Sequence, residues 1–255
     1  GGPATSAQIH MLTGIAVDGA GNVYFTDWWN NRIRKVSTAG TITTIAGSGG
    51  YKYAGDGGPA TMAQFDPAGI AVDSAGNLYI ADSSNSRIRK ITAATGVIST
   101  VAGNGVYGLG GDGGPATAAM LAHPTFVSID AAGNLNIADT CGARVRKVAV
   151  DGTISTVAGA PVGDGGPATS AFLNRPDAVA VDASGALYIA DAQHHRIRRV
   201  PPAGTISTFA GRGLHGFDEG GGQASQALLD SPAGVAVDAS GNLYIADSDN
   251  YRIRK

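Results

Sequence analysis

The sequence predicts an all-β fold, a β-propeller whose blades are four-stranded antiparallel sheets. Three observations predict it: one phrase repeats five times, each repeat holds short strands rich in β-branched residues, and those strands are apolar on both faces. Glycine supplies 39 of the 255 residues, and aromatic residues make up only 6%. That composition is typical of short strands joined by tight turns rather than of a helical bundle.

The repeated phrase reads G-I-A-V-D, then G-N-L-Y-I-A-D, then R-I-R-K. Its copies occupy residues 14–35, 69–90, 126–147, 178–199 and 234–255. The aspartates that close its first two segments recur at matching intervals, so the unit is rigid and the length variation lies in the joining segments. We predict one domain, residues 1–255, with repeat cores at 14–47, 69–103, 126–159, 178–211 and 234–255.

Each repeat is expected to form four strands, which in the second repeat are residues 70–73, 77–81, 87–91 and 97–103. The segment 78–81 is apolar on both faces, so a single sheet would leave one face in water. Stacking copies face to face around an axis buries both faces. A solenoid is the alternative, but a four-stranded antiparallel unit favours the propeller.

The segment A-V-D-x-x-G-N-L-Y-I-A-D-x-x-N-x-R-I-R-K closely resembles the NHL repeat, and the likeness covers nearly the whole chain. The joining segment with G-D-G-G-P-A-T looks like the bacterial multi-repeat branch of that family. The resemblance implies a β-propeller of five blades, or of six, a number that the family often uses. It says little about activity, because the family includes binding modules, scaffolds and a few enzymes.

The fourth strand occurs only four times, at residues 41–46, 97–102, 153–158 and 205–210. The fifth repeat therefore lacks one strand. We expect a closing strand to precede Gly1 and to pair with Arg252–Lys255. Without that strand, the open edge of the fifth blade invites self-association.

Most charges belong to the repeat itself. Fifteen of the 18 Lys and Arg residues occupy the R-x-R-K positions, and ten of the 20 acidic residues are repeat aspartates, which predicts a scaffold role. The net charge of −2, without interleaved aromatic residues, predicts no nucleic-acid partner. No apolar run reaches the roughly 20 residues of a membrane span. The single cysteine, Cys141, allows no intrachain disulfide.

A binding site is expected where the turns between second and third strands and the long joining segments meet, around the mouth of the central channel. We expect a short helix in each joining segment, as at Pro59–Gln64. Trp28 and Trp29, on one such turn, are suited to stack on a sugar or hold a protein, unless they pack on the neighbouring segment. The predicted ligand-binding residues are Trp28, Trp29, His123, Arg175, Asp177, His194, His195 and Tyr251.

Metal binding is the weaker hypothesis. His10, His123 and Asp177 are candidate ligands for Ca²⁺ or Zn²⁺. The resemblance adds that an amidating lyase with this repeat uses a metal in its propeller. No matching residue spacing in this chain supports the same metal site here, and we expect no cofactor. The G-D-G-G aspartates are expected to form turns or helix caps, with calcium binding as the alternative: Asp56, Asp112, Asp164 and, in the fifth unit, Glu219.

No nucleophile elbow, P-loop or H-E-x-x-H motif occurs in the chain. We therefore predict a non-catalytic scaffold that binds a protein, a small molecule or a carbohydrate. The alternative is a metal-dependent lyase or lactone hydrolase with its site at the channel mouth. The family resemblance and the near-absence of cysteine predict an extracytoplasmic location: periplasmic, secreted or on the cell surface.

Overall fold

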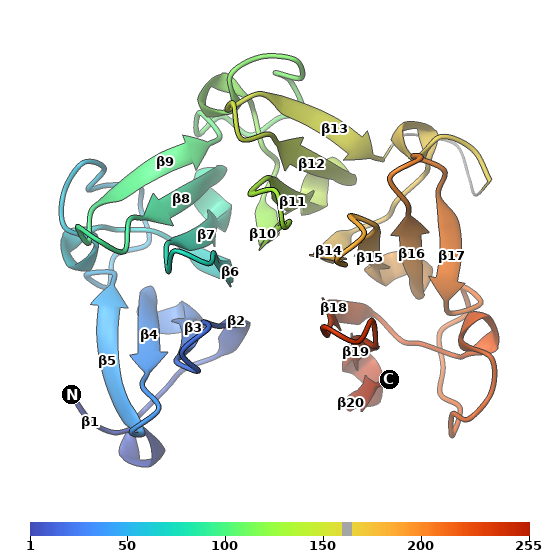
Figure 1. Ribbon diagram of the computed structural model, residues 1–255, viewed down its shortest axis with the longest axis horizontal. Helices are drawn as coiled ribbons and strands as arrows, with labels where there is room; N and C mark the ends of the chain where they lie inside the picture. Colours follow the sequence, from blue (N-terminus) through green and yellow to red (C-terminus); the bar gives the residue numbers. More distant parts are fainter. Residues whose placement is uncertain (160–164) are drawn as a thin grey trace. The chain divides into compact units, whose positions relative to one another are not determined.

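The computed structural model describes residues 1–159 and 165–255, which form two compact units, Gly1–Val127 and Ser128–Lys255. Both units are built from antiparallel sheets joined by long loops (Figure 1). Asp164, one of the G-D-G-G aspartates, lies outside the described residues.

The first unit contains two complete blades. In the first blade the strand order is β1-β5-β4-β3-β2, and in the second it is β6-β7-β8-β9. Their bounds are β1 Gly2–Pro3, β2 Leu12–Val17, β3 Val23–Asp27, β4 Arg32–Val36, β5 Thr41–Ala46, β6 Pro67–Val72, β7 Leu78–Asp82, β8 Arg87–Ile91 and β9 Ile98–Ala102.

The remaining sheets have the orders β10-β11-β12-β13, β14-β15-β16-β17 and β18-β19-β20. The fifth blade therefore has three strands, as the repeat count predicts. The bounds are β10 Pro124–Ile129, β11 Leu135–Asp139, β12 Arg144–Val148, β13 Ile154–Ala158, β14 Pro176–Val181, β15 Leu187–Asp191, β16 Arg196–Val200, β17 Ser207–Ala210, β18 Pro232–Val237, β19 Leu243–Asp247 and β20 Arg252–Arg254.

The aspartate after the first strand of each blade builds the following hairpin. In the second blade, Asp73 accepts the backbone N–H groups of Ala75 and Asn77 at 3.0 and 2.8 Å, and the Asn77 side-chain amide at 2.8 Å. Gly76 takes the left-handed conformation that closes this turn, with φ +81°. The D-x-x-G-N sequence thus fixes the turn between β6 and β7 with its own side chains.

Neighbouring blades bury their apolar faces against each other. Ile33 and Ala46 of the first blade share one core with Ile80 and Ile98 of the second blade and with Phe65 between them. The first strands also approach closely, because a Cβ at Gly14 would lie only 2.9 Å from the Gly69 Cα. This packing explains why the strands are apolar on both faces, and it confirms the propeller class.

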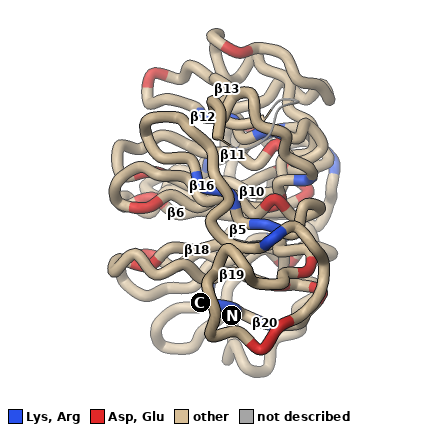
Figure 2. The backbone as a smooth tube through the Cα atoms, turned by 90° about the vertical axis from the view of Figure 1, so that its right-hand side faces the viewer, with Lys and Arg blue, Asp and Glu red and all other residues tan. Residues whose placement is uncertain are grey.

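The aspartate that ends each second strand forms an ion pair with an arginine of the third strand. All five aspartate side chains are inaccessible to solvent, and the N–O distances are 3.0 Å (Arg34–Asp27), 3.3 Å (Arg89–Asp82), 3.8 Å (Arg146–Asp139), 2.9 Å (Arg198–Asp191) and 3.3 Å (Arg254–Asp247). Figure 2 shows basic and acidic positions interspersed along the chain. The structural interpretation is confirmed for these five aspartates and their arginines.

The joining segments differ from the prediction in two respects. The expected helix at Pro59–Gln64 is a single 3-10 turn, Ala60–Met62. Asp56 caps no helix; its carboxylate accepts the Thr100 N–H at 3.0 Å and the Arg89 Nε–H at 3.0 Å. The turn-or-cap interpretation of Asp56 is therefore wrong, because this side chain ties the joining segment to strands β8 and β9.

Within the described part of the chain, no helix is long and apolar enough to cross a lipid bilayer.

Candidate functional site

The turn between the second and third strands of each blade is a rigid frame. In the first blade it is a 3-10 turn, Trp28–Asn30, followed by Asn31 in the left-handed region with φ 49°. The Asn30 side-chain amide donates to the buried Asp27 carboxylate at 2.8 Å. The third turn position thus binds the buried aspartate, while the positive φ falls on the fourth position. The first two positions remain free to present side chains.

Those two positions carry the tryptophans, and together with their neighbours they form what we call the tryptophan patch: His10, Met11, Trp28, Trp29 and Asp66. The Trp29 side chain is 66% exposed. Its ring lies 5.1 Å from the His10 ring and 6.4 Å from the Trp28 ring, nearly perpendicular to the latter. The Trp29 Nε1–H points at the Met11 sulfur, 3.0 Å away. An exposed indole is thus held in one orientation by three neighbours.

Trp28 connects the patch to the second blade. Its Nε1–H donates to the Asp66 carboxylate, which also accepts the Ser84 hydroxyl. The Asp66 backbone N–H donates in turn to Asp82 Oδ1 at 2.8 Å. The sequence left open whether the tryptophans are free or packed, and the structure divides them: Trp28 is anchored, and Trp29 is exposed.

Residues before the first strand of a blade also reach the surface in a fixed conformation. Met11, His123 and Arg175 all have positive φ, between 52° and 57°. Such angles are uncommon for residues other than glycine and mark a constrained backbone. The His123 ring packs edge-on against the Tyr107 ring at 5.6 Å, which adds a third ring contact to the two at Trp29.

The histidines of the second unit have different roles. His194 stands at the third turn position, and its Nδ1 lies 2.9 Å from the buried Asp191 carboxylate, where three other blades use asparagine. His195 Nδ1 lies 3.3 Å from Asp230 Oδ1, and the His195 ring is 5.7 Å from the His215 ring. His194 therefore serves the scaffold, and the two adjacent histidines have separate partners.

Arg175 and Asp177 form a pair in the second unit, with 3.2 Å between Nε and Oδ1. Burial raises the pKa of Asp177, while the Arg175 guanidinium opposes that rise. Tyr251 is 94% exposed and occupies the fourth position of its turn. The predicted site residues thus fall into two groups, with Trp28, Trp29 and His123 in the first unit and the other five in the second.

Metal binding gains no geometric support from the residues that the structure describes. Among them, no group of three or more His, Cys, Asp or Glu side chains is arranged to hold an ion. His10 and His123 instead make the ring contacts with Trp29 and Tyr107. What the tryptophan patch offers chemically is an apolar aromatic surface with the buried Asp66 carboxylate behind it.

The NHL repeat family model matches the chain at residues 66–91, 173–200 and 229–255. The chain carries NHL repeats. A related protein, Teneurin-3 from Danio rerio, is 33% identical over 263 residues. That match covers 87% of this chain and 9% of Teneurin-3, so the chain spans a small part of that relative.

Solved structures share the fold of this NHL-repeat chain. A virginiamycin B lyase from Staphylococcus aureus superimposes with a TM-score of 0.58 at 18% identity, covering 98% of this chain and 70% of the lyase chain. A chain of a nidogen/laminin complex gives a TM-score of 0.64 at 21% identity, covering 96% and 74%. At these identities, the likeness shows the fold and carries no activity over to this chain.

Proposed function

We propose that this NHL-repeat chain is a non-catalytic scaffold that binds a protein partner through the tryptophan patch. The observation that carries the proposal is Trp29, a large aromatic side chain that is mostly exposed yet held in place by His10, Met11 and Trp28.

Such a side chain suits an anchor at a protein interface. Tryptophan is among the residues enriched at interface hot spots, where a few side chains supply most of the binding energy. Because the Trp29 ring is already oriented, binding would cost little side-chain entropy. Exposed Met11 and Leu12 beside it extend the apolar surface that a partner would cover.

The charges of the repeat favour a scaffold over an enzyme. The buried aspartates, such as Asp27 and Asp82, are each bound by an arginine and by an asparagine of the same blade. These carboxylates stabilise blades and are closed off from a substrate. The virginiamycin B lyase shares only the fold, and among the described residues no arrangement favours the lyase or lactone-hydrolase alternative.

We also propose that the protein works outside the cytoplasm. The support is compositional: the chain has one cysteine, Cys141, and resembles repeats of an extracytoplasmic type. Fractionation of the native host, followed by immunodetection in each compartment, tests this proposal. Finding the protein only in the cytoplasm would contradict it.

The chain offers a direct optical test of the patch, because Trp28 and Trp29 are its only tryptophans. Peptides would be selected from a random phage-displayed library on the immobilised wild-type chain and then titrated in solution. We expect bound peptides to shift the tryptophan emission to shorter wavelength, because they exclude water from the Trp29 ring. A carbohydrate panel titrated in parallel distinguishes sugar stacking from protein binding.

Two variants test whether the tryptophan patch binds the selected peptides. Trp29→Ala should weaken the selected peptides about tenfold or more, which corresponds to about 1.4 kcal/mol per factor of ten. Met62→Ala, which removes another exposed apolar side chain of the same unit, serves as the control and should leave affinity unchanged. Equal affinity of the wild type and Trp29→Ala, or binding without any emission change, would exclude the tryptophan patch as the site.

A further inference from the structure

Asp66 is a buried carboxylate at the back of the tryptophan patch. Six aspartates of the described residues are buried, and five of them form the arginine pairs of the blades. Asp66 is the sixth, with 8% of its surface exposed. It makes no ion pair within the described part of the chain. The structure therefore leaves this buried negative charge without a counter-charge.

Neutral donors hold the Asp66 carboxylate in place. Its Oδ1 accepts the Trp28 Nε1–H, and its Oδ2 accepts the Ser84 hydroxyl and, at 3.3 Å, the Ser84 backbone N–H. A carboxylate offers about four acceptor positions, so Oδ1 keeps one that these donors do not use. The three hydrogen bonds fix the orientation of the carboxylate and leave its negative charge uncancelled.

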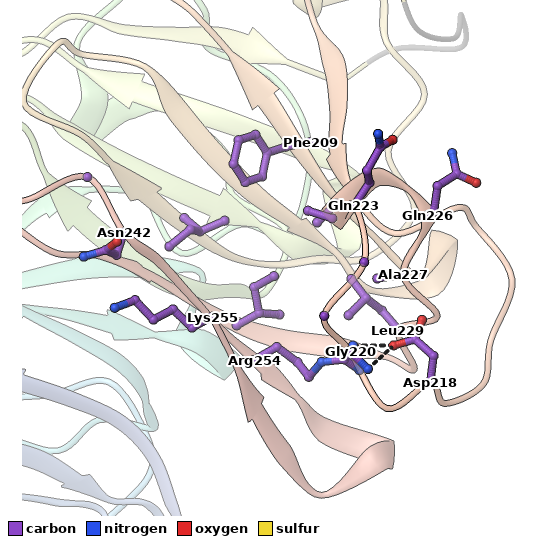
Figure 3. A pocket seen from close by; sticks show the side chains of 17 residues that line it. Phe209, Asp218, Gly220, Gln223, Gln226, Ala227, Leu229, Asn242, Arg254 and Lys255 are labelled. Atoms are coloured by element: carbon purple, nitrogen blue, oxygen red, sulfur yellow. Dashed lines mark hydrogen bonds and ion pairs between the residues drawn. The ribbon is translucent and has the colours of Figure 1, made fainter.

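Aspartates in comparable positions of the second unit have a cationic or titratable partner. Asp230 precedes the fifth blade as Asp66 precedes the second, since the backbone N–H of each donates to the buried aspartate of its own blade. Asp230 Oδ1 lies 3.3 Å from His195 Nδ1 of the preceding blade. Asp218, in the same joining segment, binds the Arg254 guanidinium (Figure 3). At Asp66, the partner from the preceding blade is an indole, which carries no charge.

The rings beside this carboxylate have faces that attract a cation. Trp29 is mostly exposed and Trp28 is half-buried, and their ring planes differ by 87°. The face of an aromatic ring carries partial negative charge, and indole is the ring that binds cations best. Because the Trp28 N–H points at Asp66, the carboxylate lies at the edge of that ring and adds to the attraction at its face.

A partner that covers the patch changes the energy of this charge. In the free chain, water still reaches the exposed part of Asp66. A partner packed on both tryptophans would displace that water, and burying a carboxylate without a counter-charge is costly. A purely apolar partner leaves this cost uncompensated, whereas a partner that brings a positive charge offsets it.

We propose that the tryptophan patch binds an arginine side chain of its protein partner. The guanidinium would stack on an indole face and direct one N–H to the remaining acceptor position of Asp66 Oδ1. Arginine suits both contacts, because its planar guanidinium stacks on aromatic rings and carries five donors. Its apolar stem would contact exposed Met11 and Leu12. This inference rests on the proposed function and adds the chemistry of the partner at the same surface.

Three short peptides that differ in one side chain test the charge. They are acetyl-Gly-Arg-Gly-amide and the same peptide with citrulline or lysine in place of arginine. Citrulline keeps the size and planarity of arginine without its charge. Each peptide is titrated into the 255-residue chain while NMR follows the two indole N–H signals. We expect the arginine peptide to bind about fivefold or more tightly than the citrulline peptide.

Two substitutions that each remove one negative charge separate the site from the overall charge of the chain. Asp66→Asn keeps a side-chain oxygen for the Trp28 N–H and should reduce the preference for arginine over citrulline to about twofold or less. Asp249→Asn removes an exposed carboxylate at the second turn position of the fifth blade and should leave the preference unchanged. Circular dichroism and the Trp28 indole signal check that Asp66→Asn folds with this hydrogen bond intact.

The possible results distinguish this inference from the proposed function. We expect arginine to be enriched among the phage-selected peptides. Selected peptides that bind through Trp29 without arginine would overturn the inference and leave the proposed function standing. Equal binding of the arginine and citrulline peptides, or an unchanged preference in Asp66→Asn, would also overturn it. Tighter binding of the lysine peptide or of free choline would assign the site to an ammonium group instead of arginine.

Discussion

The second and fifth blades contain identical segments in different surroundings. Strands β7 and β19 both read L-Y-I-A-D, and the following R-I-R-K is also the same. Yet Ile88 of the second blade is fully buried, whereas Ile253 of the fifth is largely exposed. The difference arises because the second blade has a fourth strand and a following joining segment packed on this position. Burial of the third strand is therefore supplied by distant residues and is not encoded in the strand itself.

The inner part of the blade does not depend on the fourth strand. Asp247 is as completely buried as Asp82, and each accepts the asparagine amide of its own turn, at 3.0 Å from Asn250 and 2.6 Å from Asn85. The second strand, the turn and the start of the third strand form one self-contained unit. The absence of a fourth strand affects only the outer edge of the fifth blade. Each residue of the second blade can therefore be compared with its counterpart in the fifth blade by the same substitution.

The largest single loss of stability is expected at the arginine of the third strand. Arg89 is fully buried between Asp82 and Asp56, so Arg89→Ala would leave the buried Asp82 carboxylate without its cation and should lower the free energy of unfolding by about 3–5 kcal/mol. Arg254→Ala should cost about 1–2 kcal/mol, because water reaches this guanidinium from the open edge. Urea unfolding followed by circular dichroism measures both.

The pH dependence sharpens this result. Burial raises the pKa of Asp82 to about 6, although the Asp66 N–H, the Asn85 amide and Arg89 oppose the rise. A carboxyl with a raised pKa in the folded state stabilises the fold most below its unfolded pKa, and this contribution is lost as the pH rises through about 6. The loss in Arg89→Ala should therefore shrink between pH 7 and pH 5. If the loss in the free energy of unfolding of Arg89→Ala did not depend on pH, Asp82 would not be the group that this variant leaves unpaired.

A slightly smaller loss of stability is expected at the isoleucine of the third strand. Ile88→Ala creates a cavity in a closed core and should lower the free energy of unfolding by about 2–5 kcal/mol. Ile253→Ala removes an exposed side chain and should change it by less than about 0.5 kcal/mol. The same urea experiment reports both values. Equal losses would show that Ile253 is buried in solution, for instance by self-association.

The repeat carried most of the information that the sequence held about the fold. The number of blades and the missing strand followed from counting phrases, because each hairpin is closed by residues within it, such as Asp73 and Asn77. The role of Asp56 could not be predicted, since its partner Thr100 lies 44 residues away in the next repeat. For the same reason the sequence predicts Glu219 as the counterpart of Asp56, whereas Asp218 is the residue that pairs with Arg254.

The candidate site was predictable only where a residue departs from the repeat. Trp28 and Trp29 stand out because the other blades have small or polar residues there, and the structure brings them together. His194 departs equally from the pattern but replaces asparagine as a partner of the buried aspartate. A residue that departs from the repeat is therefore a candidate binding residue. Its local hydrogen bonds decide whether its side chain is free to bind a partner.

The smallest difference is expected at the first hairpin of each blade, where the two blades should behave alike. Burial disfavours ionisation of Asp73, but hydrogen bonds from Asn77, Tyr79 and the turn backbone outweigh it and lower its pKa. In the fifth blade, the Asn242 side-chain amide and backbone N–H lower the pKa of Asp238. Side-chain carboxyl titration by NMR should find both pKa values below the usual aspartate range.

The sign of the pH effect follows from these shifts. A lowered pKa in the folded state contributes stability that is present above the unfolded value and is lost as the pH falls through the folded one. Asn77→Ala and Asn242→Ala should each raise the pKa of the neighbouring aspartate toward its ordinary value and weaken the fold near neutral pH. If Asp238 already titrated normally in the wild type while Asp73 did not, the first hairpin would need the fourth strand after all, and the inner blade would not be self-contained.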